Sequence, residues 1–187
     1  MIISMNGDLG AGKSTIAKKI AEELGMKRYY MGQILRDMSK ERGMTFLEFM
    51  KVAETDSSID KDIDEYVKKL GREENNFIIE SRTAWSFIPD SVKIYLSVDE
   101  EEGVRRIHKE LQADNKRNED VKSFEELLKN CQRRILSEQK RYKKYYNFNI
   151  RDLSHYDFVL NTTNLNPQEV LGKNLEFLRS FRQIERG

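Results

Sequence analysis

Short apolar runs alternate along this chain with longer stretches in which hydrophobic residues recur every three or four positions. Apolar runs bounded by glycine or polar residues are typical of buried strands. Largely apolar strands are predicted at residues 2–6, 77–81, 92–98 and 156–161, and a further short strand is predicted at 27–31, KRYYM, before Gly32. The stretches between them have the spacing of amphipathic helices. These predicted helices span residues 14–24, 33–43, 45–54, 57–71, 99–111, 123–147 and 166–181.

Strands that alternate with helices predict an α/β fold, in which helices cover both faces of a parallel sheet. Such sheets bind ligands just beyond the carboxyl ends of their strands. Four segments are expected there: the loop at Gly7, a turn at Gly32, Ser81–Arg82, and the end of the fifth strand. The sequence therefore predicts a single site along one edge of the sheet.

Composition narrows the class of protein only a little. The chain has 187 residues, 38% of them hydrophobic, which predicts one domain with a sizeable core. The 33 basic and 32 acidic residues nearly balance, so charge gives no general argument for nucleic acid or membranes as partners. A lone cysteine, Cys131, fits a reducing compartment, and no secretion signal or membrane span is evident. We expect a cytoplasmic protein, and nothing demands more than a monomer.

Residues 7–15, GDLGAGKST, contain the frame G-x-x-x-x-G-K-[ST] between the first predicted strand and the first predicted helix. Glycines permit backbone angles that let successive amides surround phosphate oxygens, and the helix adds its positive end. In this frame Lys13 would contact the β- and γ-phosphates of a nucleotide, and the Ser14 hydroxyl would bind Mg²⁺. The predicted ATP-binding residues are Gly7, Asp8, Leu9, Gly10, Ala11, Gly12, Lys13, Ser14 and Thr15.

Phosphate-binding loops of this kind serve GTPases, ATPases, helicases and kinases. The guanine-reading pattern N-K-x-D is absent, and no predicted strand ends in an aspartate; the nearest equivalent is Glu80, after the apolar run of residues 77–79. The small size and the helix-rich stretch between the second and third strands favour a kinase that binds a small acceptor, by analogy of fold.

The long predicted helix at 123–147 carries Arg134, Glu138 and Arg141 within about 60° of one another on a helical wheel. An apolar stripe lies beside them, made of Phe124, Leu128, Cys131, Ile135, Tyr142 and Tyr146. The stripe would anchor the helix on the core and place the charged face along its edge, over a nucleotide. Because phosphoryl transfer brings many negative oxygens together, such cations suit it. The alternative is an ordinary ion pair on a solvated helix face.

Other cations follow the predicted strands. Arg36 lies one helical turn after Gly32, and Arg82 directly follows the third strand. Arg106, Lys116 and Arg117 flank or occupy a polar loop, and a flap of cations that closes and expels water would suit phosphoryl transfer. The alternative for the loop is a solvated run of charge.

Taken together, these segments resemble the short, archaeal-type cytidylate kinases among the P-loop nucleoside monophosphate kinases. The similarity includes GDLGAGKST, GQILRDMSKERGM (32–44), AETDSSIDKDID (53–64), FIIESR (77–82), SEQKRYKKYYNFNIRDLSHYDFVLNTT (137–163) and NPQEV (166–170). The resemblance implies a three-layer fold with a five-stranded parallel sheet, all within one domain at 1–187. It also implies a helical acceptor-binding insert at 33–71 and a lid at 105–122.

The resemblance implies ATP with Mg²⁺ as the donor and CMP or dCMP as the acceptor. Gly32, Arg36, Arg82, Arg134, Glu138 and Arg141 would bind the acceptor, and Lys13, Arg134, Arg141 and Arg106 would act in catalysis. Arg106, Lys116 and Arg117 would belong to the lid. Two features differ from the family pattern, namely Ser81 in place of the usual glycine before Arg82, and a longer lid.

Two alternative functions remain open. A kinase of the same fold could act on another nucleoside monophosphate or a small metabolite, because both departures border the predicted acceptor site. A nucleotide-dependent RNA-binding protein could use KRYKKYY (140–146), where basic and aromatic residues interleave. Trp85 could line the acceptor pocket or pack in the core.

Overall fold

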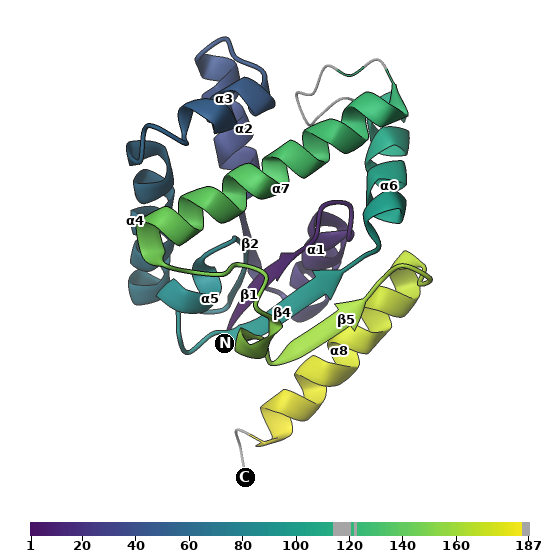
Figure 1. Cartoon of the computed structure of the whole chain (residues 1–187). Coiled ribbons are helices and arrows are strands. Elements are labelled where there is room, and N and C mark those ends of the chain that lie inside the picture. The colour runs from purple at the N-terminus through teal and green to yellow at the C-terminus, as the bar shows by residue number, and fades with distance from the viewer. Residues whose placement is uncertain (114–120, 122, 185–187) are drawn as a thin grey trace.

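Five parallel strands form the centre of the computed structural model, which describes residues 1–113, 121 and 123–184. The sheet has the order β2-β3-β1-β4-β5 (Figure 1). The strands are β1 (Ile2–Gly7), β2 (Lys27–Tyr30), β3 (Phe77–Glu80), β4 (Val92–Ser97) and β5 (Phe158–Asn161). The predicted five-stranded parallel sheet is confirmed.

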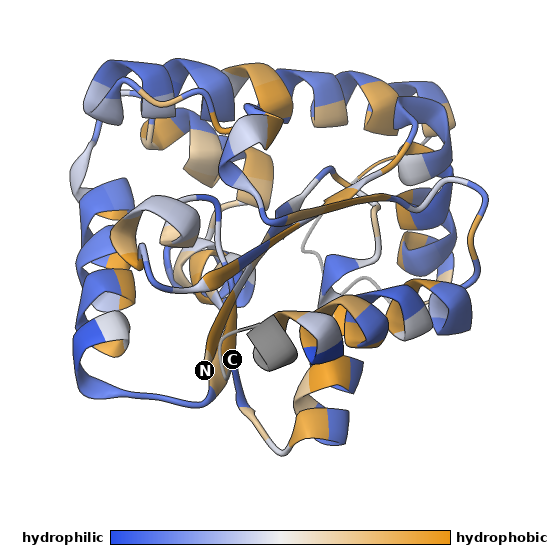
Figure 2. Cartoon of the chain, turned by 90° about the horizontal axis from the view of Figure 1, so that it is seen from below, coloured by the Kyte–Doolittle hydropathy of each residue, from blue (hydrophilic) through white to orange (hydrophobic). Residues whose placement is uncertain are grey.

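Helices cover both faces of the sheet, as the alternation of patterns predicts. The helices are α1 (Lys13–Leu24), α2 (Met31–Glu41), α3 (Phe46–Val52), α4 (Ser58–Glu73), α5 (Ala84–Phe87), α6 (Glu100–Ala113), α7 (Phe124–Tyr146) and α8 (Pro167–Ile184), with a 3₁₀ turn η1 (Leu153–His155). One core cluster joins the sheet to α1 and α8, and another joins it to α4 and α5. Figure 2 shows largely hydrophobic central strands surrounded by helices in which hydrophilic and hydrophobic residues alternate.

The longest helix, α7, crosses over the carboxyl ends of the strands (Figure 1). The Ser123 side chain caps its start by accepting a hydrogen bond from the Glu126 amide, and Asn147 ends it in the left-handed conformation. Its buried residues are Leu127, Cys131, Glu138, Arg141 and Tyr142. The helix therefore turns part of the Arg134–Glu138–Arg141 face inward, over the edge of the sheet where ligands bind.

Two local predictions are wrong, and two short elements were missed. Gly32 forms no turn but lies in the first turn of α2, because the extended backbone of Tyr30 leads directly into that helix. The helix predicted to end at Gly71 continues to Glu73. A Cβ at Gly71 would lie 2.8 Å from the Ile88 side chain, so the glycine permits close packing of α4 rather than ending it. The short α5 and η1 were not predicted, because elements this short carry little periodicity.

No helix in the described ranges is long and apolar enough to span a bilayer. The tyrosines of residues 140–146 pack internally instead of facing a partner. Tyr142 is buried, Tyr145 donates to the carbonyls of Ala53 and Glu54, and Tyr146 donates to Asp64. These rings are thus engaged within the fold, which weakens the stacking argument for RNA.

Candidate active site

The loop of residues 7–15 connects β1 to α1 and packs tightly against α6. Gly10 has a φ of +76°, and a Cβ there would lie 2.1 Å from the carbonyl oxygen of Gly103. Conversely, a Cβ on Gly103 would lie 2.4 Å from the Leu9 carbonyl oxygen. Gly12, with a φ of +82°, immediately precedes α1. The loop thus has the left-handed glycines and the helix start of a phosphate-binding cradle.

Lys13 is the first residue of α1, directly after the glycines of the loop. Its Nζ donates hydrogen bonds to the carbonyl oxygens of Gly7, at 3.0 Å, and Asp8, at 2.5 Å. Burial lowers the pKa of the amine well below its usual value, and the nearby cations of Arg82 and Arg134 lower it further. A bound anion would relieve this repulsion, so the electrostatics favour a phosphate beside all three cations.

Ser14 and Glu80 form a second polar group beside the loop. The Ser14 hydroxyl donates to Glu80 Oε2 at 2.8 Å, and Arg28 of β2 pairs with Glu80 Oε1. The Glu80 carboxylate is only 3% exposed. Mg²⁺ usually takes one or two protein ligands beside substrate phosphates, so these oxygens fit that ion. In the sequence, Glu80 is only the nearest equivalent of an aspartate at the end of a strand. No sequence pattern points to Arg28.

Glu138 bridges two of the predicted acceptor-binding arginines. Its Oε2 lies 3.0 Å from Arg82 Nε, and its Oε1 accepts from Arg134 Nε at 3.0 Å. Arg82 also donates to Asn6 Oδ1 and to the Gly7 carbonyl. Burial alone would raise the pKa of Glu138, but Arg82 and Arg134 outweigh it and lower the value to about 2. The charged face is therefore a buried network and not a solvated ion pair.

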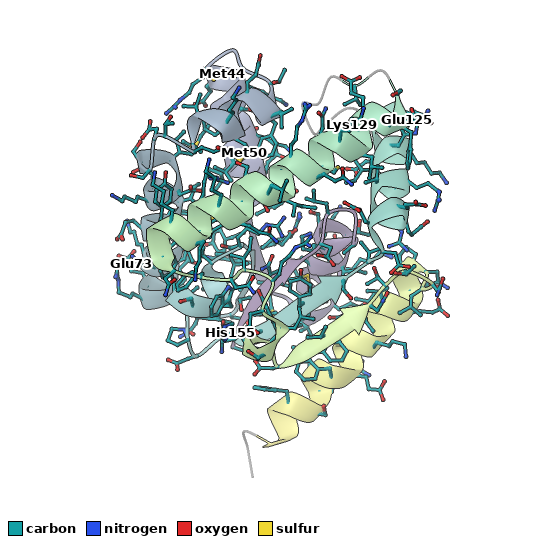
Figure 3. All side chains as sticks on the ribbon, in the orientation of Figure 1. Met44, Met50, Glu73, Glu125, Lys129 and His155 are labelled. Carbon is teal, nitrogen blue, oxygen red and sulfur yellow. The ribbon has the colours of Figure 1, made fainter. Side chains whose placement is uncertain are left out.

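Arg141 lies deeper and has its own counter-ion. Its Nη1 contacts both carboxylate oxygens of Asp60 on α4, each at 2.6 Å, and both side chains are 2% exposed. Its Nη2 lies 3.7 Å from the sulfur of Met50, which Figure 3 labels beside α7. Because Asp60 neutralises it, Arg141 offers directed N–H donors and little net positive charge.

Replacing Arg141 with methionine is expected to destabilise the fold by about 3–5 kcal/mol, because Asp60 would remain buried without its cation. Chemical denaturation measures this change. Lys140→Met is the matched control, since Lys140 is exposed and pairs with Glu54 at the surface. Adding Asp60→Asn to Arg141→Met should recover part of the loss. Equal stability of Arg141→Met and Lys140→Met would contradict the pairing.

The remaining predicted cations occupy different places. Arg36 is buried and donates to the Tyr30 hydroxyl and the Gly32 carbonyl, with its guanidinium 5.0 Å from the Phe46 ring centre. Arg106 of α6 donates to the carbonyls of Thr162 and Thr163, at 2.9 and 3.0 Å. It is thus held against the segment that follows β5. Lys116 and Arg117 lie outside the described residues.

One cavity of about 540 Å³ brings most of these groups together. Its lining includes, among others, Gly10 to Thr15, Gly32, Arg36, Phe46, Met50, Glu80, Ser81, Arg82, Thr83, Arg106, Arg134, Glu138, Arg141, Leu165, Pro167 and Val170. Gly7 and Asp8 border a smaller pocket instead. The donor loop and the predicted acceptor residues therefore face one shared space, although they come from distant parts of the sequence.

Trp85 is not among the residues that line this cavity. Its ring stacks on His155, with centroids 4.3 Å apart, and its Nε1 donates to the Arg82 carbonyl at 3.0 Å. Of the two roles left open by the sequence, the structure favours packing. Because Trp85 donates a hydrogen bond to the Arg82 carbonyl, this packing also supports the backbone of Arg82, which lines the cavity.

Comparison with known proteins places the chain among kinases. Residues 2–164 match the model of the cytidylate kinase-like family. A cytidylate kinase of Haloarcula marismortui is 34% identical over 183 residues, which cover 97% of this chain and 91% of that protein. One of Methanosarcina mazei is 38% identical over 174 residues, covering 91% of this chain and 92% of that protein.

Solved structures share the fold at low sequence identity. An uncharacterized protein from Eubacterium ventriosum has a TM-score of 0.70 and 16% identity, with 96% of this chain and 99% of that chain covered. A shikimate kinase from Bacteroides thetaiotaomicron has a TM-score of 0.60 and 14% identity, with 96% and 98% covered. At such identities the likeness concerns the fold alone.

Proposed function

Because the chain belongs to the cytidylate kinase-like family, we propose that it transfers the γ-phosphoryl group of ATP to CMP or dCMP. It is a P-loop nucleoside monophosphate kinase of the cytidylate kinase type. The structural observation that supports the proposal best is the shared cavity, whose lining includes the glycine loop and Lys13 together with Arg36, Arg82 and Arg134.

The donor would lie along the loop of residues 7–15. Loop amides and Lys13 would hold the phosphates, and Ser14 with Glu80 would hold Mg²⁺, which supplies charge neutralisation between them. Arg106 faces the same cavity as Leu165 and Pro167, so a planar base could lie between a guanidinium and apolar side chains there. We further propose that residues 105–122, with Lys116 and Arg117, form the lid.

The acceptor would lie among residues of α2, in the insert at 33–71, of the segment that follows β3, and of α7. Arg36, Arg82 and Arg134 would bind its phosphate, which would then replace the Glu138 carboxylate as the partner of Arg82 and Arg134. Once displaced, Glu138 could accept hydrogen bonds from sugar hydroxyls. Arg141, already neutralised by Asp60, would contribute directed donors to the sugar or the base.

The chemical step needs little beyond positioning and charge. An acceptor phosphate oxygen attacks in line and is already ionised, so a strong general base is unnecessary. Lys13, Arg82 and Arg134 would stabilise the negative charge that spreads over the transferred group. Burial of these groups strengthens their interactions with phosphate oxygens, because little water competes inside the cavity.

The family departure at Ser81 has a structural explanation that does not require a different acceptor. Thr83 donates its hydroxyl proton to Asp64 at 2.6 Å, so in the 3.2 Å contact with Ser81 the serine must be the donor. The amides of Thr83 and Ala84 donate in turn to the Ser81 hydroxyl. These bonds hold the backbone on both sides of Arg82 and thereby fix the position of that arginine.

A coupled assay of ADP release over CMP, dCMP, UMP, AMP, GMP and shikimate tests the proposed function. We expect CMP and dCMP to exceed every other acceptor in kcat/KM by about 10²-fold or more, because hydrogen-bonding sites strongly reject mismatched ligands. A wrong base or a non-nucleotide acceptor leaves buried donors unpaired. Preference for UMP, a purine nucleotide or shikimate would refute the assignment and support the alternative acceptor class.

A further inference from the structure

Arg28 of β2 lies outside the predicted site and does not line the main cavity, yet its guanidinium contacts a residue that does. Tyr30 is paired with Glu80 across the β2–β3 ladder, and Arg28 lies two residues earlier on the same strand. Side chains two apart share one face of a strand. Arg28 can therefore reach diagonally along the sheet to the last residue of β3.

The two oxygens of Glu80 have separate partners. Arg28 Nε and Nη2 both lie against Oε1, at 2.8 and 2.6 Å, whereas the Ser14 hydroxyl donates to Oε2 at 2.8 Å. The Arg28 guanidinium is itself placed over the Tyr30 ring, 5.2 Å from its centre. A planar guanidinium that is itself held over an aromatic ring fixes one orientation of the Glu80 carboxylate.

We propose that Arg28 is a positioning residue for the metal of the donor, because it holds one oxygen of Glu80 and thereby aims the other at Ser14. This inference rests on the proposed function, in which Ser14 and Glu80 bind Mg²⁺ with the nucleotide. Partners that orient metal-binding groups commonly change metal affinity by about 10–100-fold when they are replaced. Arg28 would act through Glu80 and would touch neither nucleotide.

If Arg28 acted only through its charge, its removal would be expected to raise the affinity for Mg²⁺ and not to lower it. A cation close to a carboxylate subtracts from the negative charge that attracts Mg²⁺, so removing it would tighten metal binding. Lysine keeps the charge but lacks the planar fork and can rotate about a flexible stem. Arg28→Lys therefore separates orientation from charge, and it leaves a cation beside the buried Glu80.

Calorimetry of ADP binding, with Mg²⁺ and separately with EDTA, tests the proposal without measuring turnover. In the wild-type protein Mg²⁺ should tighten ADP binding. In Arg28→Lys we expect this Mg²⁺-dependent gain to fall by about tenfold, with ADP affinity in EDTA unchanged. Arg28→Met, if it folds, should also lose part of the gain, but the net loss should be smaller because removing the cation favours Mg²⁺ binding. Lys27→Met is the matched control, since Lys27 is 67% exposed on the same strand and pairs with Glu74.

The outcomes distinguish a failure of the proposed metal site from a failure of the role proposed for Arg28. If Mg²⁺ does not tighten ADP binding to the wild-type protein, or if Ser14→Ala keeps the full gain, the proposed metal site is wrong. If the wild-type protein and Ser14→Ala behave as expected but Arg28→Lys keeps the wild-type gain or increases it, the inference about Arg28 alone is overturned.

Discussion

Replacing Lys13 with alanine is expected to lower kcat for CMP phosphorylation by about 10³-fold while the protein stays folded. The size follows from the loss of a buried cation aimed at the charge that develops during transfer. The fold should survive, because Lys13 donates only to the Gly7 and Asp8 carbonyls and is crowded by Arg82 and Arg134. Steady-state ADP release and a thermal unfolding midpoint measure both effects.

The control for this substitution lies on the same helix. Lys18 is largely exposed and forms only a weak surface pair with Glu22 at 3.9 Å. Lys18→Ala should leave kcat within about twofold of wild type, since such pairs contribute little. If Lys13→Ala retains activity comparable to that of Lys18→Ala, the loop does not hold the transferred phosphate.

Arg134→Ala should reduce kcat with CMP by about 10²–10³-fold and leave the thermal midpoint within a few degrees of wild type. Arg134 faces the cavity with its guanidinium 4.7 Å from the Phe46 ring centre, so it links α7 to α3 across the site. Glu138 would keep Arg82 as its ion-pair partner in this variant, so no buried charge is left alone.

The neighbouring arginine offers a matched control for Arg134. Arg133 directly precedes Arg134 on α7 and is exposed, so Arg133→Ala removes the same charge from the same helix outside the cavity. It should retain full activity. Wild-type turnover of CMP by Arg134→Ala would remove Arg134 from the acceptor site, whereas an equal loss in both variants would indicate a general effect of charge.

Most of the fold could be predicted because its elements carry strong local patterns. Most strands are short, largely apolar runs, with KRYY of β2 as the exception, and the long helices repeat hydrophobic residues with helical spacing. Gly32 and Gly71 misled the prediction of boundaries, since each lies inside a helix where its small size matters for packing. A glycine is compatible with the end of a helix, but contacts with residues distant in the sequence determine whether the helix continues through it.

The predicted donor loop was the easiest part of the site to recognise, because its residues are contiguous and follow a strand. The wheel placed Arg134, Glu138 and Arg141 together but at the edge of the apolar stripe, whereas the structure buries Glu138 and Arg141. The reason is a set of partners far away in sequence, with Asp60 on α4 for Arg141 and Arg82 after β3 for Glu138. Helical periodicity carries no information about such partners, and their roles toward substrate remain predictions.

The contact between Gly10 and Gly103 limits how sequences with this fold can diverge. Neither position can accept a side chain unless the backbones separate, so the two should vary together among homologous chains. A homologue with a side chain at the equivalent of Gly103 would have to hold α6 farther from the loop. Since α6 also carries Arg106 into the cavity, evolution could widen or narrow the space beside the loop through a residue outside the phosphate-binding motif.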